Sequence, residues 1–373
     1  MSIFHPRRAF SGTLRSTLPV MSCLISLGGT IGSTSAKNQP YPVFGTSWVS
    51  KLGVEGAVRY WPQVMVPMRD GVRLSTDILL PKGFKPPYPT VLVRTPYRKD
   101  SEVANIDSRM LWDLINHGYA VVVQNERGAF PSEGEYHYLS NARNDGYDTV
   151  EWITKQAWSS RRVAAYGCSS PAENQLALSA ANPPGLVAIV PKAAGAGIGH
   201  FPGTWSQGDF YWQGGIPFFL FIPWYRSSAW TYRLQPPDFL SGSQRSRLMQ
   251  FYLQTWQNPP DLPFTSPAYW HLPVKDILQA IGTPKSDWEG FILRAPADPA
   301  WRHEEMLTMS DHPREPALIV TSWHDMWIWQ ELLEFEHVQS RVPKQFLTVR
   351  PTGHCIMGTQ TSHTMVGQEE VGD

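Results

Sequence analysis

The first patterned part of the chain shows two apolar runs that meet at a turn. Residues 63–80 carry two stretches rich in Val, Leu and Ile, separated by Met68-Arg69-Asp70-Gly71. A turn of this composition between such runs predicts a β-hairpin. A loop rich in Pro, Lys and Gly follows at residues 81–89, so we expect the hairpin to end there.

From residue 90 the pattern changes to short apolar runs that alternate with segments of helical spacing. The runs predicted as strands are Thr90–Arg94, Tyr119–Gln124, Arg162–Tyr166 and Leu186–Val190. The segments predicted as helices are Ser108–Asn116, Asp145–Gln156 and Pro171–Ala181. Such alternation is typical of a parallel sheet with crossover helices, so the fold class predicted is α/β.

The alternation stops at about Ala193 and resumes at about Arg314. The intervening residues are rich in Trp, Phe, Tyr and Pro and show weak periodicity. A strand, a helix and a last strand are then predicted at Ala317–Thr321, Trp327–Ser340 and Phe346–Val349. We therefore expect an α/β core built from residues 61–195 and 315–373, interrupted by an insertion at 196–314 and preceded by a linker at 37–60.

Residues 1–36 have the order of a targeting segment. Arg7-Arg8-Ala9-Phe10 resembles a twin-arginine export signal, a mildly apolar stretch follows from Leu18 to Ile31, and small residues end in Ser33-Thr34-Ser35-Ala36. Basic, apolar and small-residue regions in this order predict an exported protein, periplasmic or secreted. A disordered terminus of a cytoplasmic protein is the alternative, and residues 20–23 loosely resemble a lipoprotein box.

Composition argues against several classes of function. Lys plus Arg and Asp plus Glu both number 32, so there is no bulk charge that would favour nucleic acid. No stretch reaches the roughly 18 apolar residues of a membrane span. The three cysteines match no zinc pattern, and the glycines at 195, 197 and 199 fall short of a dinucleotide fingerprint and are interpreted as a loop.

One motif carries candidate chemistry. Residues 163–175 read VAAYGCSSPAENQ, in which a predicted strand leads through Gly167 into Ser169 and a helix begins at Pro171. A serine on a sharp turn between strand and helix is typical of a nucleophile elbow, and the N–H of Ser170 would then face a developing oxyanion. Pro171 replaces the last glycine of the Gly-x-Ser-x-Gly pattern, so a helix-capping serine remains the alternative for Ser169.

Two further residues complete a candidate triad. Asp325 follows the predicted strand at 317–321, and His354 follows the predicted strand at 346–349. An activated serine needs a histidine base and a carboxylate that orients it, and the order Ser, Asp, His is the order of this elbow type. His324 is a rival base, but its place beside Asp325 favours the role of a neighbour.

The core segments together resemble a known family. The matching stretches are VPMRDGVRLSTDILLP (66–81), VLVRTPYRKD (91–100), GYAVVVQNERG (118–128), DGYDTVEWITKQAWSSRRVAAYGCSS (145–170), ALIVTSWHDMW (317–327) and PTGHC (351–355). They resemble the cocaine-esterase-like branch of the X-Pro dipeptidyl-peptidase-type hydrolases. The resemblance implies an α/β-hydrolase fold in which the aromatic-rich insertion forms a helical cap over the active site.

The resemblance also implies roles for single residues. Ser169, Asp325 and His354 match the triad, and Tyr97 matches a tyrosine that shares the oxyanion hole with the Ser170 amide. Ser170 departs from the family, which often has Tyr there. Family members usually carry a C-terminal jelly-roll domain, and we expect it to be absent from this chain.

These observations predict a serine hydrolase that forms an acyl-enzyme on Ser169 and needs no metal or organic cofactor. The first hypothesis is hydrolysis of carboxylic esters, and of amides as an extension, with a bulky apolar or aromatic acyl group. X-Pro dipeptidyl-peptidase or amino-acid ester hydrolase activity is the second, and an inactive binding protein or truncated fragment is the third. The expected partner is a small-molecule substrate, and the oligomeric state stays open.

The preference for an apolar or aromatic acyl group rests on the aromatic side chains of the insertion. Most of them are expected to pack against one another in the core of the cap. They are Phe201, Trp205, Phe210, Tyr211, Trp212, Phe218, Phe219, Phe221, Trp224, Tyr225 and Trp230. A substrate amine would need a carboxylate, for which Glu173, Asp209 and Asp298 are candidates. Cys168 and Cys355 flank the candidate nucleophile and base, so we expect them to lie close together, as a buried thiol pair in preference to a disulfide.

Overall fold

The computed structural model describes the α/β core and part of the insertion. The described residues are 56–97, 99, 108–129, 131–195, 219–228, 240–241, 243–244, 247, 266–283, 285–294, 307–308, 310–355, 364–366 and 369–371. The predicted export signal at 1–36 and most of the predicted linker lie outside them. β1 begins at Val58, so this strand takes in the last residues of the stretch predicted as linker.

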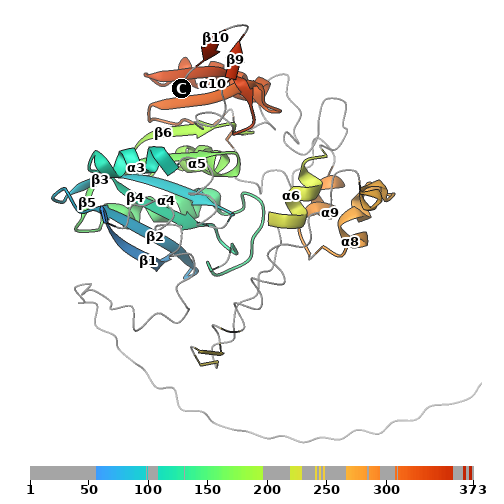
Figure 1. Cartoon of the computed structure of the whole chain (residues 1–373), viewed down its shortest axis with the longest axis horizontal. Coiled ribbons are helices and arrows are strands. Elements are labelled where there is room, and N and C mark those ends of the chain that lie inside the picture. Colours follow the sequence, from blue (N-terminus) through green and yellow to red (C-terminus); the bar gives the residue numbers. More distant parts are fainter. Residues whose placement is uncertain are drawn as a thin grey trace, which may run out of the picture. The chain divides into compact units, whose positions relative to one another are not determined.

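Eight strands form one mixed sheet in the order β1-β2-β4-β3-β5-β6-β7-β8 (Figure 1). β1 pairs antiparallel with β2, β2 pairs antiparallel with β4, and the remaining neighbours are parallel. The strands are β1 (Val58–Pro67), β2 (Arg73–Pro81), β3 (Tyr88–Thr95), β4 (Ala120–Asn125), β5 (Ser159–Cys168), β6 (Leu186–Lys192), β7 (Ala317–His324) and β8 (Gln345–Gly353). The predicted hairpin and the predicted α/β class are confirmed.

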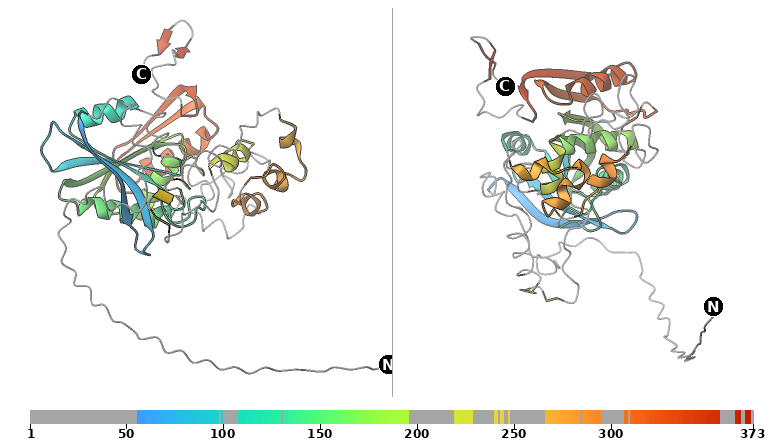
Figure 2. Two further views of the ribbon diagram at one scale, coloured as in Figure 1. Left: turned by 60° about the horizontal axis from the view of Figure 1, so that its bottom comes forward. Right: turned by 90° about the vertical axis from the view of Figure 1, so that its right-hand side faces the viewer.

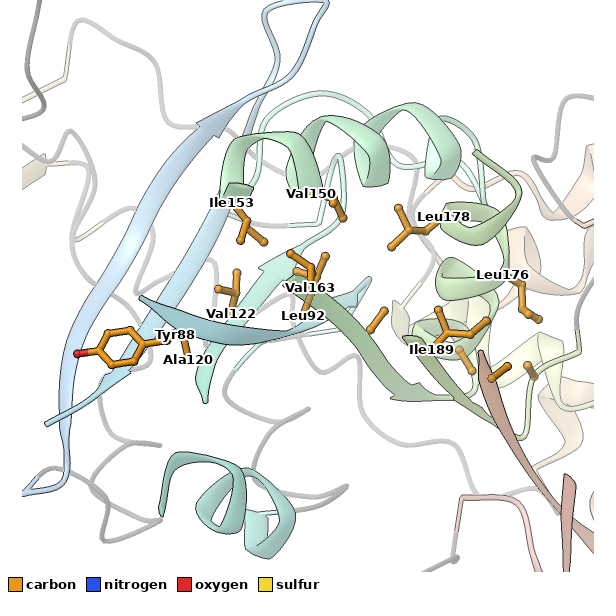
Figure 3. Packing of buried hydrophobic residues seen from close by; sticks show 14 of the residues in the cluster. Tyr88, Leu92, Ala120, Val122, Val150, Ile153, Val163, Leu176, Leu178 and Ile189 are labelled. Atoms are coloured by element: carbon orange, nitrogen blue, oxygen red, sulfur yellow. The ribbon is translucent and has the colours of Figure 1, made fainter. Parts of the chain in front are cut away.

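Helices cover both faces of this sheet, as a parallel sheet requires. The core helices are α3 (Ser108–Asn116), α4 (Ala142–Thr154), α5 (Ser170–Ala181) and α10 (Ile328–Gln339). In Figure 3 the side chains of Val150 and Ile153 on α4 and of Leu178 on α5 point toward Leu92, Val122 and Val163 on the strands. α3 packs on the other face, where Ile115 meets Val91, Val93, Val121 and Val123.

The central strands carry almost no exposed surface, which explains their continuous apolar runs. All six residues of β4 are buried, and Leu92, Val122 and Val163 are at most 1% exposed. Full burial of one such side chain stabilises the fold by about 1.5–3 kcal/mol. The sheet is therefore a rigid platform, and the parallel strands β3, β5, β6, β7 and β8 present their carboxyl ends along one edge.

Short helices occupy the described part of the segment between β6 and β7. They are α6 (Phe221–Ser228), η4 (Pro267–Trp270), η5 (Val274–Asp276), α8 (Ile277–Ala280) and α9 (Trp288–Ile292), and Figure 2 shows them grouped together. Phe221 and Tyr225 of α6 pack in one apolar cluster with Trp288 and Phe291 of α9, and this cluster also takes in Tyr138 and Trp327 of the core. The Gly195–Gly199 stretch falls outside the description after its first residue.

Some element boundaries differ from those predicted. α4 begins at Ala142, three residues before the predicted start. β5 runs from Ser159 to Cys168 and extends the predicted strand at both ends, up to the residue before Ser169. Two short strands, β9 (Thr364–Val366) and β10 (Glu369–Val371), pair antiparallel in a tail for which no element was predicted.

Candidate active site

Ser169 stands on a strained turn between β5 and α5. Its backbone has φ 63° and ψ −132°, a conformation that a residue with a side chain adopts only at a cost. The N–H of Ser169 donates to the carbonyl of Lys192 on β6 (2.9 Å), which anchors the turn to the neighbouring strand. Ser169 is the N-cap residue of α5, yet its side chain makes no capping hydrogen bond, so the capping alternative is wrong.

Gly167 and Pro171 make this turn possible. A Cβ atom at Gly167 would lie 2.5 Å from Cβ of Pro171, closer than carbon atoms approach in proteins. Pro171 stands in the first turn of α5, where a missing backbone N–H removes no helical hydrogen bond. At the start of α5 the N–H groups of Ala172 and Glu173 donate to the carbonyl of Ser169, which leaves the Ser170 N–H as the helical N–H beside Ser169 that has no acceptor inside the helix.

Asp325 and His354 form a hydrogen-bonded pair at the ends of β7 and β8. His354 Nδ1 lies 2.9 Å from Asp325 Oδ2, and Asp325 is 5% exposed. The other carboxylate oxygen accepts from the backbone N–H of Trp327 (3.0 Å). A carboxylate that receives Nδ1–H leaves Nε2 of a neutral imidazole as an acceptor. The rival base His324 is exposed, one residue outside this pair.

The end of β8 is held in place by several contacts. The ring of Trp327 packs edge-on against His354, with centroids 4.9 Å apart. Ser322 Oγ donates to the carbonyl of Gly353 (3.1 Å), directly before the histidine. No hydrogen bond joins Ser169 to His354 within the described part of the chain. Catalytic hydrogen bonds of this type are often long in ligand-free enzymes.

A cavity opens at Ser169. Its empty volume is ≈ 290 Å³, open solvent included, and its lining is largely aromatic. The lining residues are Tyr97, Tyr138, Ser169, Ser170, Glu173, Leu220, Phe221, Trp224 and Trp327. The candidate nucleophile and both predicted oxyanion-hole residues therefore share one cavity, and Trp327 connects its wall to His354.

Tyr97 is fixed from three directions. Its backbone N–H donates to Thr95 Oγ1 (3.1 Å), and its carbonyl accepts from Asn125 Nδ2. Its hydroxyl oxygen accepts from the indole N–H of Trp224 (2.9 Å). Ser170 is 3% exposed at the first position of α5, where the backbone N–H has no acceptor inside the helix.

Two carboxyl groups of this region are buried, Glu173 in the cavity lining and Glu126. Glu173 is 3% exposed and accepts from the hydroxyl of Tyr138 (2.8 Å). Glu126 accepts from Asn174 Nδ2 (2.7 Å), and burial raises the pKa of Glu126 to about 8 against the opposing effect of Arg94. Glu173 was a predicted carboxylate, whereas the other two, Asp209 and Asp298, lie outside the described residues.

Sequence reasoning missed three residues of this region. Trp327 stands two positions after Asp325, and a tryptophan so close to a candidate acid was a usable signal. Tyr138 and Glu126 lie in segments without periodicity, and no pattern pointed to them. Of the aromatic residues predicted in the insertion, Phe221 and Trp224 line the cavity, Phe219 and Tyr225 lie outside its lining, and the remaining seven are outside the described residues.

A disulfide joins Cys168 to Cys355, with Cα atoms 5.8 Å apart. The residues were expected to be neighbours, which is confirmed, but the favoured interpretation as free thiols is wrong. This separation lies in the range that a disulfide spans without backbone movement. The bond therefore links the residue before Ser169 to the residue after His354.

Two kinds of feature are absent from the described residues, a metal-binding cluster and a membrane-spanning helix. In that part of the chain no group of three or more His, Cys, Asp or Glu side chains is arranged to hold a metal ion. None of the helices that the structure describes has the length and apolar character needed to cross a membrane.

Known proteins share this fold and sequence. The chain is 39% identical over 150 residues to the cocaine esterase of a Rhodococcus strain, a match that covers 40% of this chain and 26% of the esterase. An aminopeptidase from a Thaumarchaeota archaeon superimposes with a TM-score of 0.60 at 24% identity, over 80% of this chain and 49% of the aminopeptidase. An α-amino-acid ester hydrolase gives 0.59 at 20% identity, over 87% and 52%. These structures show the fold alone.

The chain thus spans about half of these solved structures, and the sequence match spans about a quarter of the esterase. The mixed eight-stranded sheet flanked by helices is the α/β-hydrolase fold. Residues 70–356, well over half of the chain, match the family described as X-Pro dipeptidyl-peptidase (S15 family). On this match the chain belongs to the X-Pro dipeptidyl-peptidase (S15) family.

Proposed function

We propose that this chain is a serine hydrolase that cleaves carboxylic esters with a bulky apolar or aromatic acyl group. The observation that carries the proposal is Ser169, which adopts a strained backbone conformation, makes no capping hydrogen bond with its side chain and lines the aromatic cavity. Strain of this kind persists where a function requires the side chain to be presented. The esterase and ester-hydrolase names of two similar proteins support the same reaction class.

The mechanism follows from the roles proposed for each group. His354 Nε2 accepts the proton of Ser169 Oγ as the oxygen attacks the acyl carbon, and Asp325 stabilises the imidazolium. The tetrahedral oxyanion receives hydrogen bonds from the Tyr97 hydroxyl and the Ser170 N–H. Collapse expels the alcohol, which takes the proton from His354. Water then attacks the acyl-enzyme with His354 again as base, and the acid leaves Ser169.

A second candidate function is the hydrolysis of amino-acid esters or X-Pro peptides. Glu173 favours it, because its carboxyl group lies in the cavity lining within four residues of Ser169. A carboxylate at this position would pair with the ammonium group of a substrate. The name of the family and the names of the two superimposed proteins agree with this class.

Residues 196–314 are proposed to form a cap, and residues 1–36 an export signal. Leu220, Phe221 and Trp224 of this segment line the cavity beside Ser169, which supports the cap. The Cys168–Cys355 disulfide supports export, because such bonds persist in oxidising compartments. Expression of the full chain with and without a working twin-arginine translocase tests the signal: a shortened protein in the periplasm only when the translocase works is expected.

The first experiment is covalent labelling with a fluorophosphonate, followed by intact mass measurement. Wild type is expected to gain one adduct, and Ser169→Ala none. Ser160→Ala is a matched control, since Ser160 lies on β5, the strand that leads to Ser169, and its hydroxyl has no hydrogen-bond partner among the described residues; this variant should label like wild type. An unlabelled wild type that is folded would refute the hydrolase and favour a binding protein.

Substrate class is separated by the rates on two chromogenic compounds. The ester hypothesis predicts faster turnover of p-nitrophenyl benzoate than of glycyl-prolyl-p-nitroanilide. Preference for the second compound, lost in Glu173→Gln, would instead support the amine-binding alternative.

A further inference from the structure

The hydrogen bond between Trp224 and Tyr97 joins two distant parts of the chain. Trp224 belongs to α6 in the segment between β6 and β7, whereas Tyr97 follows the end of β3. The indole Nε1 lies 2.9 Å from the phenol oxygen, and the two residues are 127 positions apart. Both line the cavity that contains Ser169. The bond therefore lies in the wall of the site where the acyl group would react.

The direction of this hydrogen bond is fixed by chemistry. An indole N–H is a donor only, so the Tyr97 oxygen must be the acceptor. The phenol proton cannot be used in this bond and is left for another acceptor. A hydroxyl that accepts a hydrogen bond is also polarised toward stronger donation. Trp224 thus prepares the Tyr97 hydroxyl to donate, which is the role that an oxyanion hole requires.

Both partners are held by their own surroundings. The ring of Trp224 makes edge contacts with Tyr138 (5.6 Å between centroids), Phe221 (5.9 Å) and Tyr225 (5.1 Å). Tyr97 is held through its backbone, which bonds to the side chains of Thr95 and Asn125. Because neither partner depends on the other for its place, their hydrogen bond can set the hydroxyl orientation.

We propose that Trp224 is a positioning residue of this hydrolase, whose indole N–H directs the Tyr97 hydroxyl proton toward the oxyanion formed on attack by Ser169. The inference rests on the proposed function. It makes the α6 segment a part of the catalytic apparatus as well as a wall of the substrate cavity. No atom of Trp224 forms or breaks a bond in the reaction.

The expected signature is a loss in kcat with little change in KM. The oxyanion exists only in the tetrahedral intermediate and its transition states, so a weaker oxyanion hole lowers turnover more than substrate binding. Trp224→Phe keeps an aromatic ring and removes the N–H, and we expect kcat to fall about 10- to 100-fold. Tyr97→Phe removes the donor itself, and a fall of about 100- to 1000-fold is expected.

A double-mutant cycle tests whether Trp224 acts through Tyr97. Wild type, Trp224→Phe, Tyr97→Phe and the double variant are compared on p-nitrophenyl benzoate. The proposal predicts that Trp224→Phe has almost no further effect once the Tyr97 hydroxyl is gone. An equal loss in both backgrounds, or an unchanged kcat in the single variant, would overturn it.

Trp288→Phe is the matched control. Trp288 is buried in the same aromatic cluster, 5.7 Å from Tyr225 between ring centroids, and its indole N–H has no hydrogen-bond partner within the part of the chain that the structure describes. This variant removes an indole from the cluster without removing a hydrogen bond, so kcat should stay near wild type. A loss as large as that of Trp224→Phe would assign the effect to packing and refute the proposal.

Two additions keep the test decisive. If Trp224→Phe does not fold, replacement of Trp224 by 3-benzothienylalanine keeps both rings and lacks only the N–H. Affinity for phenylboronic acid, whose tetrahedral adduct on Ser169 carries an oxygen in place of the oxyanion, should fall by the same factor as kcat. A folded wild type that neither hydrolyses the ester nor binds the boronic acid would refute the proposed function, and this inference with it. An active wild type with an unaffected Trp224 variant refutes the inference alone.

Discussion

Reduction of the Cys168–Cys355 disulfide should impair both stability and turnover. The bond joins residues 187 positions apart, and it ties the end of β5 to the chain beyond β8. These strands are three places apart in the sheet, which is about 14 Å at the usual strand spacing, yet the two Cα atoms are 5.8 Å apart. The chain after β8 therefore turns back across the ends of β6 and β7, and the disulfide holds it there.

The loss of stability follows from the length of the closed loop. In the chain-entropy account, a cross-link that closes a loop of this size lowers the entropy of the unfolded chain. This raises the free energy of the unfolded state by about 5 kcal/mol at 25 °C. For a domain of more than 250 residues, that corresponds to a fall in Tm on the order of 10 °C. The bond is packed against Ala193 and Val320, and Cys168 is fully buried. Substitution of both cysteines by alanine would add a small packing loss to this figure.

The loss of turnover follows from the position of His354. This proposed base is one residue from Cys355, at the end of a strand that lies at the edge of the sheet. It is held otherwise by Asp325, by Trp327 and by the contact between Ser322 and Gly353. A shift of the base by about 1 Å can cost about 100-fold in rate, so we expect kcat to fall about 10- to 100-fold with KM nearly constant.

The assay compares wild type with the Cys168→Ala/Cys355→Ala double variant, each with and without a dithiol reductant. Alkylation followed by intact mass reports the number of free thiols, and thermal melting and ester hydrolysis are measured on the same samples. Cys23→Ser in the unprocessed chain is the control, because it removes the cysteine that takes no part in the bond. The reasoning is refuted if the double variant melts within about 2 °C of wild type and keeps its kcat.

Three other substitutions test the remaining arguments. Asp325→Asn keeps the shape of the acid but presents the wrong hydrogen-bonding pattern to His354, so kcat for ester hydrolysis should fall by about 10⁴-fold; an unchanged kcat contradicts the triad. Gly167→Ala places a Cβ 2.5 Å from that of Pro171, so urea unfolding should show that the free energy of unfolding falls by about 1–3 kcal/mol. A variant as stable as wild type would contradict this close approach. Burial raises the pKa of Glu334 to about 8 from 4.5, so the folded chain keeps a proton that the unfolded chain loses, and stability falls as pH rises from 4.5 to 8. Glu334→Gln should therefore stabilise the protein by up to about 4 kcal/mol at pH 8 and far less at pH 5, and equal gains at both pH values would refute this.

Much of the fold could be predicted because its strands are buried on both faces. β3, β4 and the second half of β5 from Val163 onward form largely apolar runs for this reason, and local pattern was sufficient to find them. The start of α4 was placed too late. Asn144 and Asp145 are residue types favoured at an N-cap, whereas the helix begins after Asn141, which adopts a left-handed backbone and whose side chain makes no capping hydrogen bond.

The segment between β6 and β7 gave no usable pattern for a physical reason. α8 and α9 have four and five residues, too few for a period of 3.6 residues to repeat. Aromatic side chains of this segment, such as Tyr269 of η4 and Trp288 of α9, are buried in one cluster with Tyr138 of the core. This segment is stabilised by tertiary packing, so neither the helix propensity nor the residue spacing of its sequence reveals its helices.

The candidate site likewise contains features that local pattern reveals and features that it does not. Ser169, Asp325 and His354 each follow a predictable strand, and parallel strands must end at one edge, so local pattern alone brings the three near one another. The contacts that would tune them are pairwise and distant: Cys168 with Cys355 across 187 residues, and Trp224 with Tyr97 across 127. A single sequence carries no periodic signal for such pairs, because each partner is compatible with its own segment whether or not the other is present. The position of a residue that follows from its own segment was therefore predictable, and orientation that depends on a pair became visible only in the structure.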